Sequence, residues 1–132
     1  MGLDNEFMIK KHQNQLINKI LHRAFIHEKY RDMFSVAYYR KCWNVRSLVF
    51  EVLEYPSNFV IDEWQFPVNQ KQIKQVIKSL KTLNEDNWED EGSSIWTFEE
   101  MEKHLKADIR RLKILYFLMF FLKLEVHFED SY

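Results

Sequence analysis

Hydrophobic residues recur along the chain with two different periods, which together predict four helices and three strands. Spacings of three and four residues are typical of amphipathic helices and occur at 16–25, 45–53, 73–83 and 98–119. Short apolar or alternating runs predict strands at 5–10, 59–68 and 124–129. Pro67 assigns the second strand to a sheet edge. The stretch 27–34 is charged and aperiodic, so we expect a connection there.

Residues at the helix ends support these boundaries. Asn69 is a good N-cap for the third helix, and Thr97 with Glu100 forms a capping box for the fourth. Pro56 disfavours helical geometry at the residue before it and so ends the second helix. We expect residues 1–132 to form a single α+β domain, with about four helices packed on a small, mainly antiparallel sheet. The N-terminal and C-terminal strands should pair beside the central strand near Trp64.

Glycine is scarce, which removes several function classes. Gly2 and Gly92 are the only two glycines in 132 residues. Two glycines so far apart cannot form the glycine-rich turns of dinucleotide-binding proteins, P-loop proteins or common serine hydrolases. These three classes of protein are therefore excluded. We therefore expect turns to form at asparagines, which tolerate left-handed geometry: Asn58, Asn69, Asn84 and Asn87.

The net charge, the longest apolar run and the first residues of the chain indicate where the protein is found and which partners it lacks. Nineteen Lys and Arg against twenty Asp and Glu give a net charge of −1, so the whole molecule has no field to attract nucleic acid or an anionic membrane. The longest apolar run, 114–122, is far shorter than the roughly 20 residues of a membrane span. The first residues lack a signal-peptide pattern, and Glu6 breaks the myristoylation pattern. We expect a cytoplasmic protein with no membrane partner.

Candidates for catalytic or metal chemistry are weak. The five histidines show no i,i+4 pair, and the acidic segment 85–91 lacks the order of a calcium loop, so no metal or other cofactor is expected. Cys42 follows Arg40 and Lys41, which favour a thiolate, but no local signature supplies a histidine base. A structural cysteine at a helix start is the better interpretation, and we assign no catalytic residue.

A lysine stripe occupies one face of the third predicted helix. Its members are Lys71, Lys74, Lys78 and Lys81. Four phosphate contacts would give weak, salt-sensitive nucleic-acid binding, and no aromatic residue interleaves the stripe to stack bases. A solvated face is favoured, and a charge complement to the acidic segment 85–91, within one chain or between subunits, is a further alternative.

A second cluster combines aromatic rings with cations and gives a speculative ligand site. Its members are Asp4, Tyr38, Tyr39, Arg40 and Lys41. Here Arg40 would clamp an anion, and Asp4 would orient it or act as a base. Half-buried rings at a strand-to-helix junction, with their polar tips in water, are the favoured alternative.

The end of the last predicted helix is apolar on all sides, which predicts burial all around. Two explanations stay open. Either the rest of the domain wraps this segment, or one face forms a homo-oligomer contact. The candidate interface residues are Tyr116, Phe117, Phe120 and Phe121.

Three segments carry a resemblance to a known family: Met1-Gly2-Leu3-Asp4, Val36-Ala37-Tyr38-Tyr39-Arg40-Lys41, and Phe128 with Asp130-Ser131-Tyr132. The chain resembles small proteins of unknown function from bacteriophages and bacteria. This resemblance implies no activity, cofactor or substrate. Relatives follow Arg-Lys with Ala-Asn, whereas this chain has Cys42-Trp43, and it lacks the relatives' loop glycines.

Two function hypotheses follow. The first is a non-enzymatic interaction or accessory protein, of phage or mobile-element origin by the resemblance, that acts on a partner protein. The alternative is a ligand-binding protein or enzyme with the anion pocket around Asp4, Tyr38, Arg40 and Lys41. Nucleic-acid binding through the lysine stripe is weaker than both.

Overall fold

The described part of the chain folds into a five-stranded antiparallel sheet and four helices. The computed structural model describes residues 4–40, 42–54, 63–88 and 96–131. The strand order is β2-β3-β1-β5-β4. The strands are β1 (Asp4–Lys10), β2 (Ile26–Glu28), β3 (Met33–Arg40), β4 (Glu63–Pro67) and β5 (Val126–Ser131). The helices are α1 (Gln15–Ala24), α2 (Trp43–Leu53), α3 (Gln70–Leu80) and α4 (Phe98–Leu118). The predicted α+β domain is confirmed.

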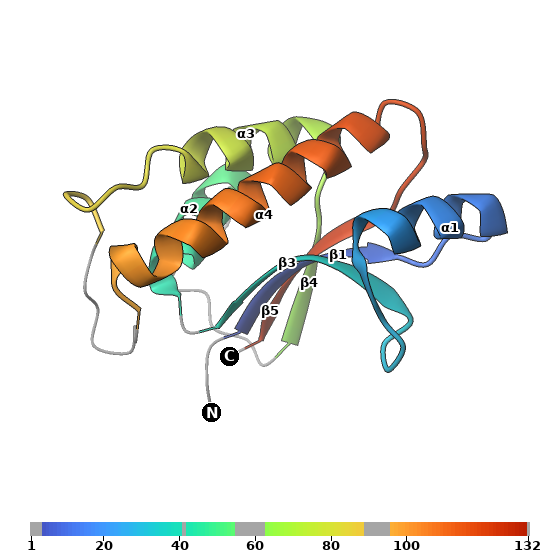
Figure 1. Ribbon diagram of the computed structural model, residues 1–132, viewed down its shortest axis with the longest axis horizontal. Coiled ribbons are helices and arrows are strands. Elements are labelled where there is room, and N and C mark those ends of the chain that lie inside the picture. The colour runs from blue at the N-terminus through green and yellow to red at the C-terminus, as the bar shows by residue number, and fades with distance from the viewer. Residues whose placement is uncertain (1–3, 41, 55–62, 89–95, 132) are drawn as a thin grey trace.

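Helices α2, α3 and α4 lie on one face of the sheet, and α1 lies to one side (Figure 1). The core between sheet and helices is aromatic: the Phe7 and Phe128 rings are 4.8 Å apart, and Phe50 of α2 lies 5.6 Å from Phe66. We call the opposite side of the sheet the bare face, because none of α2, α3 and α4 covers it.

The predicted pairing of the terminal strands is confirmed. Phe128 of β5 lies opposite Phe7 of β1 and, on its other side, opposite Phe66 of β4. Strand β4 is an edge strand that ends at Pro67, as the proline indicated, and the other edge is the three-residue strand β2. Within the described residues, both edge strands are therefore short.

The prediction of a connection at 27–34 was wrong, and strand β3 was missed with it. Residues 26–28 form β2, which turns back into β3 through Asp32 with a φ of 53°. Ala37 pairs with Phe7 and Ser35 with Met8, so Val36 is an extra residue in a β-bulge. The bulge breaks the alternation of buried and exposed residues by which a strand is recognised.

The predicted helix starts are confirmed, but the asparagine turns work differently from the prediction. Asn69 with Gln72, and Thr97 with Glu100, form complete capping boxes. Asn84 accepts hydrogen bonds from the backbone of Asp86 and Asn87 instead of adopting left-handed geometry. The left-handed non-glycine residues in the described chain are Asp32 and Glu54, which is the C-cap of α2. Tyr55, Pro56 and Asn58 lie outside the described residues.

A buried ion pair ties α2 to the middle of the sheet. Arg46 reaches Asp130 of β5 with two hydrogen bonds of 3.0 Å, and both side chains are almost fully buried. Asn5 of β1 donates to the same carboxylate at 2.5 Å. The guanidinium carbon of Arg46 lies 4.2 Å from the centre of the Phe50 ring, so the charge is also held by a cation–π contact.

We expect Asp130→Asn to destabilise the protein by about 3–5 kcal/mol, because it leaves the buried Arg46 charge without its carboxylate. Glu125→Gln is the matched control. Its exposed pair with Lys10, at 3.6 Å, should change the free energy of unfolding by less than about 1 kcal/mol. Urea denaturation measures both variants, and equal effects would contradict a structural role for the buried pair.

Candidate interaction surface

The structure brings together part of the predicted ligand cluster and separates the rest. Asp4 of β1 lies directly opposite Arg40 of β3, with Tyr38 two positions along the same face. Burial, followed by a hydrogen bond to Asp4, raises the pKa of Tyr38. Tyr39 points to the helix side and is buried in the core. Lys41 lies outside the described residues.

Beside these residues, three carboxylates on or near the bare face meet one guanidinium that the sequence did not single out. Arg31, in the β2–β3 hairpin, contacts Glu129 at 2.7 Å, Glu28 at 2.8 Å and Glu6 at 2.5 Å. Burial raises the pKa of Glu6, although hydrogen bonds from Ser35 and Arg31 oppose the shift. Burial acts to lower the pKa of Arg31. The hydrogen bonds and charges of the three carboxylates outweigh burial, so the pKa is raised above its ordinary value.

The acidic surplus on this face bears on the predicted anion site. Asp4, Glu6 and Glu129 face two cations, Arg31 and Arg40, so an anion near Arg40 meets negative charge on the neighbouring strands. These carboxylates disfavour an anion beside Arg40.

Among residues 4–40, 42–54, 63–88 and 96–131, no three His, Cys, Asp or Glu side chains are placed to hold a metal ion.

A second polar cluster lies where α4 crosses β3. Asp108 is buried, accepts a hydrogen bond from Arg111 at 2.9 Å and lies 3.1 Å from Nε2 of His104. Burial raises the pKa of Asp108 to about 6, although His104, Tyr39 and Arg111 all act to lower it. Burial, and then the charge of Asp108, also raises the pKa of Tyr39. The Nε2 atom of His104 donates to the Tyr38 carbonyl oxygen at 2.9 Å. This cluster joins the helix to the strand.

We expect Asp108 to make stability depend on pH. Its folded pKa of about 6 lies above its ordinary value of 3.8, so the folded state holds the proton more tightly. The resulting stabilisation is present below pH 3.8 and is lost as the pH rises through about 6, by up to about 3 kcal/mol.

Asp108→Asn removes this titration, and urea denaturation between about pH 4 and 7 measures the difference in slope from the wild type. Asp86→Asn, at an exposed position, is the control and should leave the slope unchanged. Parallel pH profiles for the wild type and Asp108→Asn would contradict the assignment.

The C-terminal end of α4 carries an exposed aromatic patch. Phe117 and Phe120 are each 60% exposed and Phe121 is 71% exposed, with Ile114 beside them at 39%. The rings pack on one another, at 5.2 Å for Phe117–Phe121 and 5.1 Å for Tyr116–Phe120. The rest of the domain therefore does not wrap this segment, although Tyr116 itself is half-buried. Three of the four predicted interface residues lie open to solvent.

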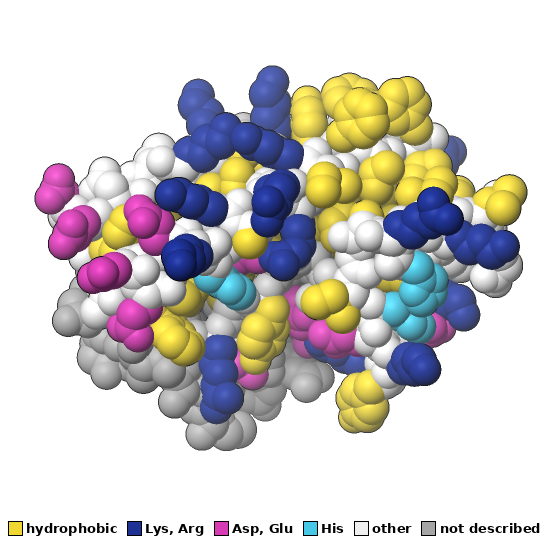
Figure 2. Space-filling view, in the orientation of Figure 1, with side chains coloured by type: hydrophobic (Ala, Val, Ile, Leu, Met, Phe, Trp, Pro, Cys, Tyr) yellow, Lys and Arg dark blue, Asp and Glu magenta, His cyan; other side chains and the backbone are white. Residues whose placement is uncertain are grey.

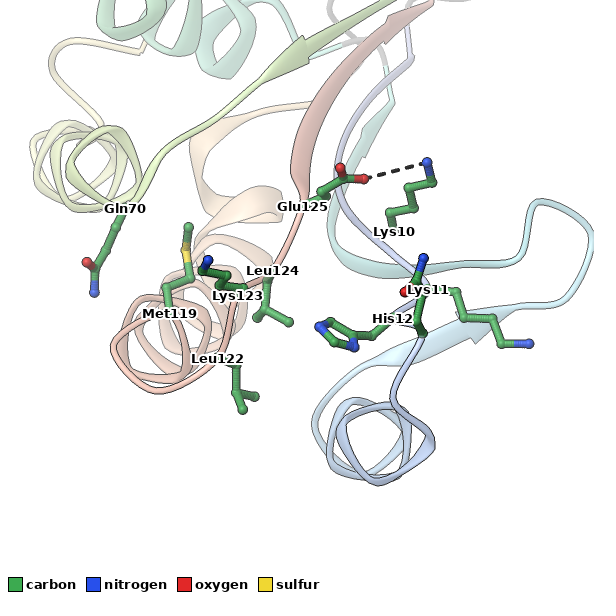
Figure 3. A pocket seen from close by; sticks show the side chains of 10 residues that line it. Lys10, Lys11, His12, Gln70, Met119, Leu122, Lys123, Leu124 and Glu125 are labelled. Carbon is green, nitrogen blue, oxygen red and sulfur yellow. Dashed lines mark ion pairs between the residues drawn. The ribbon is translucent and has the colours of Figure 1, made fainter.

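The patch extends toward α1 across a hollow. Met119, Leu122 and Leu124 of the α4–β5 turn line one side of a cavity of about 600 Å³, and Lys10 to Gln13 line the other. Figure 3 shows His12 and Leu124 pointing toward each other across the gap between the two segments. On α1, which follows the Lys10 to Gln13 segment, Leu16 is 68% exposed and Ile20 is 43% exposed. We call the α4 patch together with Leu16 and Ile20 the apolar end.

Cations adjoin the apolar end. Figure 2 shows Lys and Arg side chains gathered over α3 and α4, next to the hydrophobic side chains of the α4 terminus. The exposed cations of these helices include Lys74, Lys78, Lys81, Lys106, Arg110 and Lys113. Lys113 comes within hydrogen-bonding reach of Lys81 and lowers its pKa, so like charges crowd here. The lysine stripe of α3 is thus one part of a larger basic surface.

Exposed carboxylates gather at the opposite end of α4. Glu85 and Asp86 follow α3, and Glu99 and Glu102 lie in the first turns of α4. The rings of Trp88 and Phe98 are 5.8 Å apart and join the two segments. Figure 2 shows these acidic side chains on the side away from the apolar end. We call this region, with its half-buried Trp88 and Phe98, the acidic end.

Comparisons with protein-family models, curated proteins and solved structures found no match. No helix in the described part of the chain has the length and apolar character needed to cross a membrane.

Proposed function

We propose that the protein is a non-enzymatic interaction module and that the apolar end is its docking surface. The observation that carries the proposal is the exposure of Phe117, Phe120 and Phe121 side by side at the end of one helix. Contiguous apolar surface of this kind on a folded chain is typical of binding sites. A role as a phage or mobile-element accessory protein is part of the hypothesis only through the resemblance.

Burial of these rings gives enough free energy for binding. Covering a fully exposed Phe contributes about 1.5–3 kcal/mol, so three rings that are more than half exposed offer several kcal/mol to a partner. Large aromatic side chains are also the residues that most often dominate interface energetics. In the free protein these rings remain in contact with water, so the free energy of burying them is available to a partner. This favours a docking role for the surface.

The double substitution Phe117→Ser with Phe121→Ser tests the surface. Both side chains are mostly in solvent, so we expect an unchanged fold by circular dichroism and loss of partners from pull-downs out of the cells that make the protein. Tyr30→Ser is the matched control, because Tyr30 is an aromatic side chain, 97% exposed, on the β2–β3 hairpin and not in the apolar end. It should retain every partner of the wild type.

If the same partners elute from the wild type and from the double variant, the apolar end is not the docking surface. If Tyr30→Ser also loses them, the loss reflects exposed aromatic residues in general and the proposal fails in the same way.

A further inference from the structure

This inference rests on the proposed function and names the partner. We propose that the apolar end is covered by the acidic end of a second copy of the chain, so that copies associate head to tail. The two regions lie at opposite ends of α4, which has 21 residues and therefore spans about 30 Å. A contact between different surfaces of identical chains either closes a ring or continues as a linear assembly.

Charge argues against a two-fold contact of the apolar end with itself. In the second half of α4 and the turn that follows, from residue 109 to 124, the chain has four Lys and Arg and no acid. From residue 10 to 24 the sequence has no acid at all. Glu125 follows, but it is already paired with Lys10. A symmetric contact would therefore bring the cations of both copies together without neutralising them.

The acidic end supplies the two features that a partner of the apolar end needs, namely carboxylates for its cations and apolar area for its phenylalanines. Glu99 and Glu102 are exposed and can face Arg110 and Lys113, which lie within two turns of Phe117. Trp88 and Phe98 are half-buried, so their remaining exposed surface offers apolar area for the phenylalanines. Complementary charge around an apolar centre is the usual arrangement of a specific protein interface.

The form of the aromatic patch disfavours a polyanion as the occupant. Single-stranded nucleic acid stacks its bases on open ring faces along a basic track. Here Phe117 packs on Phe121 and Phe120 on Tyr116, and the exposed aliphatic side chain of Ile114 lies one turn before Phe117 on the same helix. The patch is thus a continuous apolar surface, which suits burial against protein side chains.

Two complementary variants test the arrangement in the full-length protein. Phe117→Ser with Phe121→Ser disables the apolar end, and Glu99→Lys with Glu102→Lys reverses the acidic end while the capping residue Glu100 is kept. Light scattering over a range of concentrations should show growing assemblies for the wild type and for Tyr30→Ser, and monomers for each double variant alone.

Mixing the two double variants should restore association but stop it at one-to-one dimers. Each chain then contributes one intact surface, and the two disabled surfaces terminate the assembly. Circular dichroism of each variant alone establishes that both are folded before they are mixed.

Other outcomes overturn the inference in ways that separate it from the proposed function. A wild type that stays monomeric at all concentrations excludes the second copy, although partners lost with the Phe117 and Phe121 substitutions would leave the docking surface standing. Association of the acidic-end variant alone would indicate a two-fold contact. Binding of the monomer to vesicles rich in phosphatidylglycerol, or to an oligothymidine probe, would assign the surface to an anionic partner instead.

Discussion

The buried pair of Arg46 and Asp130 is the interaction on which the fold depends most. Asp130 must face the helices to meet Arg46, and a one-residue slip of β5 would turn it to the bare face and take Phe128 out of the core. Asn5 donates to the same carboxylate from β1, so a single buried charge fixes the register of the two central strands and the position of α2. The packing of α3 and α4 follows from that frame.

The net charge of −1 conceals a strongly uneven distribution. Cations gather over α3 and the outer part of α4, while carboxylates gather at the start of α4 and around Arg31 near the bare face. The net charge of the whole chain predicts no electric field that could direct binding. Along α4, however, exposed carboxylates lie in the first turns and exposed cations toward the other end. That polarity becomes visible only when the folded chain places residues 88 and 98 together and residues 81 and 113 together.

Local signals predicted those parts of the fold that depend on neighbouring residues. The capping boxes at Asn69 and Thr97 and the strands at both ends of the chain and near Trp64 were predicted from the sequence, since the caps rest on short-range chemistry and the strands on a regular apolar period. Strand β3 was not, because its bulge at Val36 interrupts that period. The contact of Arg31 with Glu129 joins residues 98 positions apart and has no local signature. For the candidate site, the apolar run 114–122 indicated an interface, but the choice between wrapping and exposure required the packed domain.

The short edge strands limit the form that association can take. Strand β2 has three residues and β4 ends at Pro67, which has no backbone N–H to donate. Within the described residues, neither edge strand offers a long row of free backbone groups on which another strand could grow. The head-to-tail contact proposed above would therefore join copies through their helices, and not by the strand addition that leads to cross-β aggregates.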